Sequence, residues 1–219
     1  MNKPLVSALM LTRNRFSLFK KSVEDFVSQT YEFKELIIVN NGNWLYKLRC
    51  DRFLEGMNAA IKHIKIKHMS IGEMRNVGIE NSNGDFMIIF DDDDTHGPSR
   101  IEFQLDICLK SNVDATLLKN FVASRNKKDR YMCSMAHGLE GSMLFRKPPS
   151  TIKYSDMNQG EDTFFKKSLL DNRYKIIVLD NNHELYEYRF HGKNTVSKRH
   201  FDKIVQRKSN RRIIELEGI

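Results

Sequence analysis

Short apolar runs separated by helix-like segments constrain the fold of this chain more than any other feature. The runs at 5–11, 36–39 and 86–90 are almost wholly apolar, as in strands that are buried on both faces of a sheet. Large apolar side chains recur at helical spacing between Phe16 and Val27, which predicts a helix after the first strand. Strands that alternate with helices predict an α/β fold with a mostly parallel central sheet, flanked by helices and joined by right-handed crossovers.

The remaining elements follow from the same periodicities, and the second half of the chain is less regular than the first. In the first half, helices are expected over 44–60, over 71–81 and from Pro98 onward, with a short strand within 64–69. In the second half, strands are expected at 115–118, 143–145, 175–179 and 184–190, among longer loops.

The cysteines bear on the cellular setting of the protein. There are three, Cys50, Cys108 and Cys133, and they are widely spaced. This odd number argues against a disulfide framework and a zinc cluster, and it fits a reducing, cytoplasmic location. No apolar stretch approaches the ~20 residues that span a bilayer, and the run at 5–11 is typical of a strand rather than of a signal peptide.

The net charge of +8 is unevenly distributed, and much of it lies between Lys193 and Arg212. A basic balance of this kind suggests a polyanionic partner or a phosphorylated ligand. We interpret this C-terminal segment as a solvated basic helix face. Peripheral contact with an anionic membrane or with a partner is the alternative.

Three of the expected strands end in polar loops, at 12–15, 40–43 and 91–94. Parallel strands place their carboxyl ends at one edge of the sheet, and ligands of open α/β sheets bind in the crevice at that edge. The three loops are therefore expected to converge on one binding site.

The third loop consists of four consecutive aspartates, Asp91 to Asp94. Adjacent carboxylates repel one another, so they need water, basic groups or a cation nearby. In an extended chain Asp91 and Asp93 point to one side, and this spacing offers two oxygen ligands to a hard divalent ion while phosphates supply others. A metal or nucleotide site is expected here, and a solvated acidic turn before a helix is the alternative.

Four further side chains each allow two interpretations when taken alone. Arg75 can meet a phosphate or nucleobase near a helix start, or can be a surface arginine. Glu161 and Asp162 precede an apolar helix, where a carboxylate is either an N-cap or a general base for an acceptor hydroxyl. His191 follows an expected strand, and is either structural or a ligand of a metal or diphosphate.

The motif-bearing segments, taken together, point to a known family. They are 4–15, 28–30, 35–39, 75–78, 83–94 with Pro98 and Arg100, and 160–162. Their order and spacing resemble glycosyltransferase family 2, inverting enzymes of the GT-A fold. This resemblance implies a single GT-A domain over 1–195, with a nucleotide-sugar-binding half over about 1–100 and an acceptor-side half over about 101–195, followed by a basic helical segment over 196–219.

The resemblance also implies a role for each residue of the site. The residues that would bind the nucleotide sugar are Leu11, Thr12, Arg15, Asn41, Arg75, Asp91 and Asp92. Asp93, helped by Asp91 and His191, would hold Mn²⁺ or Mg²⁺ against the diphosphate, and Asp162, or else Glu161, would be the catalytic base. One departure lies at Asn40-Asn41, where the family usually has two aspartates. An amide both donates and accepts hydrogen bonds, so the base preference is expected to change.

The implied activity is transfer of a sugar from a nucleotide-diphosphate sugar, with a UDP-sugar favoured, to a hydroxyl of a glycan or glycoconjugate, with inversion of the anomeric configuration. A sugar-phosphate nucleotidyltransferase is one alternative, although the loop at 12–15 lacks the glycines of a triphosphate loop. A non-catalytic GT-A-like binding module is another. Nucleic acid is not expected as a partner, because the site edge is acidic and no aromatic-basic stacking motif stands out.

Overall fold

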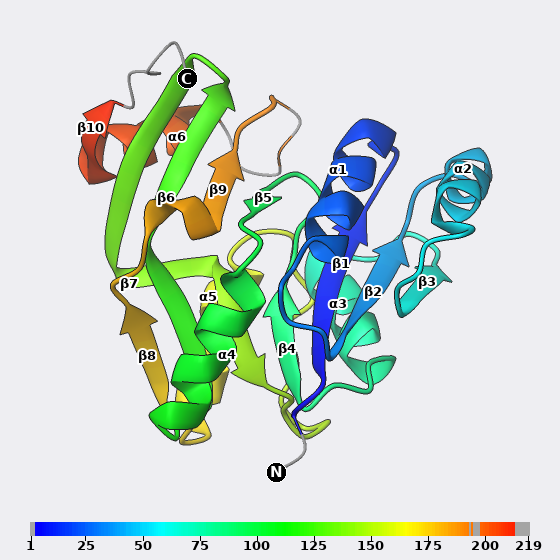
Figure 1. Cartoon of the computed structure of the whole chain (residues 1–219), viewed down its shortest axis with the longest axis horizontal. Coiled ribbons are helices and arrows are strands. Elements are labelled where there is room, and N and C mark those ends of the chain that lie inside the picture. The colour runs from blue at the N-terminus through cyan, green and yellow to red at the C-terminus, as the bar shows by residue number, and fades with distance from the viewer. Residues whose placement is uncertain (1–2, 193, 195–197, 213–219) are drawn as a thin grey trace.

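One large mixed sheet organises the molecule (Figure 1). The structure is a computed structural model that describes residues 3–192, 194 and 198–212. The strands are β1 (Val6–Thr12), β2 (Lys34–Asn40), β3 (Ile61–Lys65), β4 (Phe86–Ile89), β5 (Thr95–His96), β6 (Ala115–Asn126), β7 (Asp129–Arg146), β8 (Ile176–Leu179), β9 (Tyr186–Arg189) and β10 (Ser209–Arg212). The helices are α1 (Phe16–Val27), α2 (Trp44–Leu54), α3 (Ile71–Glu80), α4 (Arg100–Lys110), α5 (Glu161–Asp171) and α6 (Lys198–Lys208), with a 3₁₀ turn η1 (His183–Leu185).

The sheet order is β3-β2-β1-β4-β7-β6-β9-β5, with β8 beside β6 and β10 beside β7. The first four strands of this order run parallel to one another, and β7 joins β4 antiparallel. Strands β8 and β9 both run parallel to β6. Parallel pairs therefore predominate over the antiparallel pairs of β7, β5 and β10 among the described strands, as the alternating sequence pattern predicts.

Side-chain alternation along β1 explains how both faces of the sheet are covered. Met10 points to one face and packs in a core with Phe19 of α1 and Ile101 of α4. Its neighbour Leu9 points to the other face and packs in a second core with Phe165 of α5. All of these side chains are at most 1% exposed. A strand buried on both faces must be apolar at every position, so the continuous apolar runs of the sequence correspond to central strands.

Two expected elements of the first half have different bounds in the structure. Helix α2 ends at Leu54 instead of continuing to residue 60, because Glu55 leaves the helical conformation and Gly56 takes a left-handed φ of 82°. Strand β3 lies earlier than the expected 64–69, because it pairs with β2 from Ile61 through Lys65. The residues after position 65 instead form the loop that follows the strand.

The second half contains a long hairpin, β6–β7, of which only the ends at 115–118 and 143–145 were expected. Its outer part has mixed burial and lacks the clean apolar alternation that identifies a strand in a sequence. This hairpin carries β9 and β10 on its two sides. It thereby extends the sheet beyond the parallel strands of the first half.

The basic C-terminal segment is helical only as far as Lys208, and β10 then pairs antiparallel with β7. Phe201 of α6 is completely buried and packs against Tyr188 and Phe190. The start of the expected segment, 196–197, and its end, 213–219, lie outside the described residues. None of the described helices is long and apolar enough to cross a membrane. All three cysteines are free and buried.

Candidate active site

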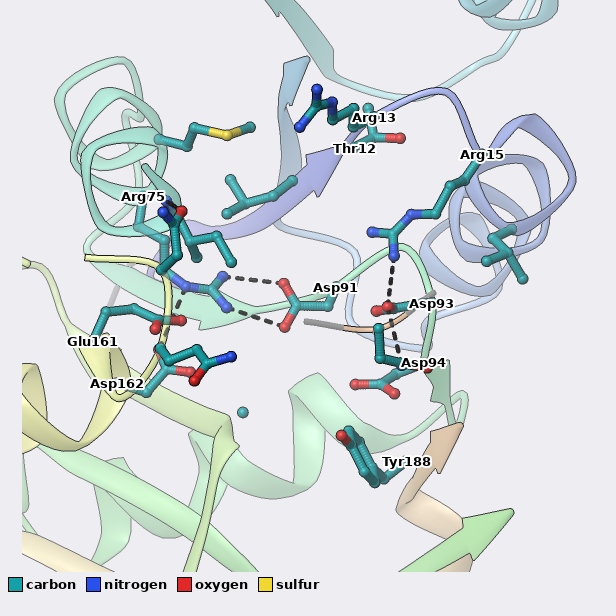
Figure 2. Close-up of a pocket in the computed structure, with 18 of the residues that line it drawn as sticks. Thr12, Arg13, Arg15, Arg75, Asp91, Asp93, Asp94, Glu161, Asp162 and Tyr188 are labelled. Carbon is teal, nitrogen blue, oxygen red and sulfur yellow. Dashed lines mark hydrogen bonds and ion pairs between the residues drawn. The ribbon is translucent and has the colours of Figure 1, made fainter. Parts of the chain in front are cut away.

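A cleft of roughly 2170 Å³ lies at the carboxyl ends of β1, β2 and β4. The three polar loops that end these strands converge on it, as the parallel arrangement predicts. The expected site residues that line it are Leu11, Thr12, Arg15, Asn41, Arg75, Asp91, Asp93, Glu161, Asp162 and His191. Figure 2 shows many of them facing a common space. Asp92 is the one expected residue that does not line this cleft.

The four aspartates form two pairs. Asp91 and Asp93 line the cleft, whereas the side chains of Asp92 and Asp94 are buried. Asp92 is 1% exposed. It accepts a 2.6 Å hydrogen bond from Thr12 Oγ1 and forms an ion pair with Arg15. The expectation that Asp92 faces the nucleotide is therefore wrong for this structure. Because the chain turns after β4 ends at Ile89, the second aspartate points inward, where it fastens the β1 loop.

Asp94 is also buried, at 4% exposure, although its edge reaches the cleft wall. Its carboxylate accepts hydrogen bonds from the Tyr186 hydroxyl and, at 3.1 Å, from the Arg189 backbone N–H. The last aspartate therefore ties the acidic turn to β9.

Arg75 projects from α3 and is 2% exposed, so it is not a surface arginine. Two of its nitrogens donate to the two carboxylate oxygens of Asp91 at 3.1 and 3.0 Å, and its Nε lies 3.4 Å from Asp162 Oδ1 (Figure 2). A bidentate pair of this kind fixes both partners. The Arg75 guanidinium, which was expected to contact the donor, is thus paired with carboxylates in this structure. Asp91, which was expected to contact the donor and the metal, is paired with that guanidinium.

Asp162 lies in the first turn of α5, which begins at Glu161. The N-cap of this helix is Gly160, with a left-handed φ of 78° and no side-chain capping bond, so neither carboxylate is the N-cap. Burial raises the pKa of Asp162 to about 7 against the lowering effect of Arg75, and burial also raises the pKa of Glu161. A carboxyl group with a pKa near neutrality is well suited to accept a proton at physiological pH.

Asp93 and His191 come together from distant parts of the chain, 98 positions apart. His191 Nε2 lies 3.1 Å from Asp93 Oδ2, and Arg15 donates to the same oxygen at 2.8 Å. Burial raises the pKa of Asp93, but the hydrogen bond from His191 and the charge of Arg15 outweigh it and lower the pKa overall. Asp93 is therefore an ionised carboxylate next to an imidazole.

This pair fits a divalent cation that is shared with a ligand. Carboxylate oxygen and imidazole nitrogen are both ligands of first-row divalent ions. The described residues contain no group of three or more His, Cys, Asp or Glu side chains arranged around a metal position. If the protein supplies two coordinating side chains, the remaining coordination positions of the cation are left to phosphate oxygens and water, as is common in Mg²⁺ sites.

The family assignment rests on a match that covers most of the chain. The model described as glycosyl transferase family 2 matches residues 7–172. The chain belongs to glycosyl transferase family 2. This family is an inverting one. The motif segments fall inside the match up to Asp162, except for residues 4–6 of the first segment, which precede it.

Individual relatives of this family 2 chain share only part of their length with it. An uncharacterized glycosyltransferase of Haemophilus influenzae is 27% identical over 123 residues, which are 53% of this chain and 47% of that protein. A glucosyl-dolichyl phosphate glucuronosyltransferase of Haloferax volcanii is 31% identical over 116 residues, 51% of this chain and 37% of that protein. The chain thus spans half or less of the length of these curated relatives.

Solved structures show the same fold at low sequence identity. TarS 1–349 of S. aureus in complex with UDP-GlcNAc has a TM-score of 0.72 at 14% identity, with 92% of this chain and 64% of that chain covered. The mannosyltransferase PcManGT of Pyrobaculum calidifontis, in complex with GDP-Man and Mn²⁺, has a TM-score of 0.69 at 12% identity, with 92% and 59% covered. The predicted GT-A-type α/β fold is confirmed.

The loops that border the family 2 site are braced by residues that the sequence analysis gave no role. Tyr46 of α2 bonds through its hydroxyl to Thr12 Oγ1, and a chain of hydrogen bonds runs from Asp51 through His63 to Asn40. Asn40 Oδ1 accepts from the Gly42 backbone N–H at 2.7 Å, which fixes the loop after β2. The only sequence signal for this series of hydrogen bonds was the position of Asn40 at a strand end, because the other two residues, Asp51 and His63, come from α2 and β3.

Proposed function

We propose that this chain transfers a sugar from a nucleotide-diphosphate sugar to a hydroxyl of a glycan or glycoconjugate, with inversion at the anomeric carbon. The observation that carries the proposal is the position of Asp162, a carboxyl group with a pKa of about 7, in the same cleft as His191 and the ionised carboxylate of Asp93. A proton acceptor and a diphosphate-binding pair are the two requirements of direct displacement at a sugar.

In the proposed reaction, Asp162 removes the proton of the acceptor hydroxyl. The acceptor oxygen attacks the anomeric carbon from the face opposite the leaving nucleoside diphosphate, and the bond to the diphosphate breaks with its electron pair. Arg75 holds Asp162 and Asp91 in place through the contacts described above. Asp93 and His191 would hold Mn²⁺ or Mg²⁺, which supplies positive charge to the leaving diphosphate when bound.

A UDP-sugar is the favoured donor. TarS, which shares the fold, forms a complex with UDP-GlcNAc, whereas PcManGT forms one with GDP-Man, so a guanosine donor is the alternative. Asn41 lines the cleft, and its Oδ1 is buried without a hydrogen-bond partner among the described residues. An amide oxygen in this position accepts a hydrogen bond from a ring N–H, which both uracil and guanine possess.

The compartment belongs to the same proposal. We favour the cytoplasm, because all three thiols are free and buried and would be kept reduced there.

Thermal shift with UDP-, GDP- and dTDP-sugars, each with and without Mn²⁺, tests donor binding. A ligand at ~100 times its Kd stabilises a protein by about 2.7 kcal/mol through mass action, which is several degrees for a domain of this size. The expected result is a shift for one nucleotide that requires Mn²⁺. NMR of the product should show inverted configuration, and a retained configuration would refute the mechanism. Donor binding without hydrolysis or transfer to any acceptor would support a binding module instead.

A further inference from the structure

The outward face of α2 is apolar and exposed. Trp44, Leu45 and Leu48 are 69%, 61% and 38% exposed, whereas Tyr46 and Cys50 of the same helix point into the core. The three exposed side chains lie at positions i, i+1 and i+4, so they form one stripe on the helix surface. Trp44 is the only tryptophan of the chain. We call Trp44, Leu45 and Leu48 the α2 stripe.

Cations border the α2 stripe. Residues 41–50 contain no aspartate or glutamate. Arg49 and Arg52 are exposed on the same helix, and Arg13 is exposed on the neighbouring β1 loop. The acidic residue of the helix, Asp51, already pairs with Lys47 at 2.5 Å and with His63 at 2.7 Å. The surface around the stripe therefore combines apolar side chains with uncompensated positive charge.

A second basic surface borders the same cleft from the other side. Lys198, Arg199 and Lys203 of α6 are exposed, while Phe201 is buried and Asp202 pairs with Arg125, so the helix is anchored to the hairpin. Figure 1 shows α2 and α6 on opposite sides of one end of the molecule. The cleft is lined by Leu45 and Arg49 from α2 and by His200 and Ile204 from α6. Both helices therefore form the rim of one opening.

We propose that α2 docks this protein on an anionic membrane surface, with the mouth of the cleft turned toward the lipid. Tryptophan and leucine on one face of a helix with arginine beside them are typical of helices that lie in the membrane interface. The arginines of α2 and the basic residues of α6 face lipid phosphates, and each cation near such a surface strengthens the attraction. The docked cleft meets acceptors that are held at that surface. Docking itself does not depend on the proposed chemistry.

Trp44 reports on this interaction directly, because it is the only tryptophan of the chain and therefore the source of all tryptophan fluorescence. We expect a blue shift and quenching by brominated lipid when the protein meets vesicles of phosphatidylglycerol and phosphatidylcholine, and a much smaller effect with phosphatidylcholine alone. Raised salt should weaken binding, since charges at the surface are screened. No blue shift and no cosedimentation with the anionic vesicles would overturn the proposal.

The matched variants are Leu48→Ser and Trp44→Ser, which remove stripe residues that do not line the cleft. Each should weaken cosedimentation with anionic vesicles about tenfold, in line with the apolar area withdrawn from the interface. The control is Leu109→Ser, which removes a leucine that is 48% exposed in the last turn of α4 and should bind vesicles as the parent does. Equal binding by all of these variants would overturn the proposal.

Two further measurements keep the outcomes distinct. Unchanged melting temperatures and unchanged UDP-sugar binding would show that the variants are folded. Sedimentation without lipid tests whether the α2 stripe instead joins two copies of the chain, and a dimer that Trp44→Ser dissociates, with no vesicle binding, would refute membrane docking. Vesicle binding by Asp162→Asn should equal that of the parent, so a failure of the proposed catalysis leaves this test intact.

Discussion

Nε of Arg75 lies 3.4 Å from Oδ1 of Asp162, and neither atom has a hydrogen-bond partner among the described residues. The same guanidinium holds Asp91 through two hydrogen bonds at its other nitrogens. Asp162 is thus near enough to a cation to be held in position, yet its oxygen keeps its capacity to accept a proton. This relationship is the basis of the first three predictions.

Asp162→Asn should lower transfer by about 10²–10⁴-fold, the range typical of a lost general base, and leave donor binding intact. The amide keeps the shape of the side chain but cannot take a proton. Glu161→Gln is the matched control one residue earlier, and it should cost much less. Transfer rates together with Kd for the UDP-sugar decide the matter. Loss of donor binding in Asp162→Asn would contradict its assignment as the base.

The transfer rate should depend on pH through Asp162. Its pKa is raised to about 7, and the ionised form accepts the proton, so kcat should increase as the pH rises from 6 to 8 and then level off. A pH-independent kcat in this window, with chemistry shown to limit the rate, would argue against Asp162.

Asp162 should also reduce stability at high pH. A folded-state pKa of about 7 lies above the unfolded value of ~3.9, so this group destabilises the folded state progressively as the pH rises through that window. Asp162→Asn should therefore raise Tm by roughly a few degrees at pH 8 and have little effect near pH 4. Parallel melting curves at the two pH values test this sign, and a lower Tm for the variant at pH 8 would contradict it.

His191→Ala should weaken Mn²⁺ binding in the presence of nucleotide by about 10–100-fold, because Asp93 loses its imidazole partner. Activation curves against Mn²⁺ concentration measure this change. His183→Ala removes a histidine that does not line the cleft, and it should leave the curve unchanged. An unaltered curve for His191→Ala would exclude His191 from the metal site.

His63→Ala should raise KM for the donor several-fold and change kcat little. It removes the acceptor of the Asn40 amide hydrogen and the donor to Asp51, at 3.0 and 2.7 Å, which together brace the loop after β2. Lys62→Ala is the control, since Lys62 is an exposed neighbour on the same strand. Equal KM values for the two variants would show that the loop does not depend on His63.

The sequence predicted the strand ends well. A strand that is buried on both faces must be apolar, so an abrupt change from apolar to polar residues marks its end. It therefore placed Thr12, Asn41 and Asp93 at one edge. It could not give the direction of Asp92, since that depends on how the chain turns after Phe90. The partners of Arg75 were equally hidden, because Asp91 and Asp162 reach it from separate elements of the fold.

The outer part of the β6–β7 hairpin was missed for a different reason. Its burial does not alternate regularly, so period-two patterning carries no signal there. The α2–β3 region was misplaced because Gly56 and the pairing with β2, not apolar periodicity, decide where these elements end and begin.

The pairing of Asp93 with His191 has a consequence for how the protein is made. The two residues are 98 positions apart, and Asn194 also reaches Asp93 at 3.4 Å. Domains form as the chain leaves the ribosome, N-terminal part first. The strands β1 to β4 can pair early during translation, but the site stays incomplete until residue 194 has emerged. A nascent chain that stops short of this point presents the acidic turn without its histidine.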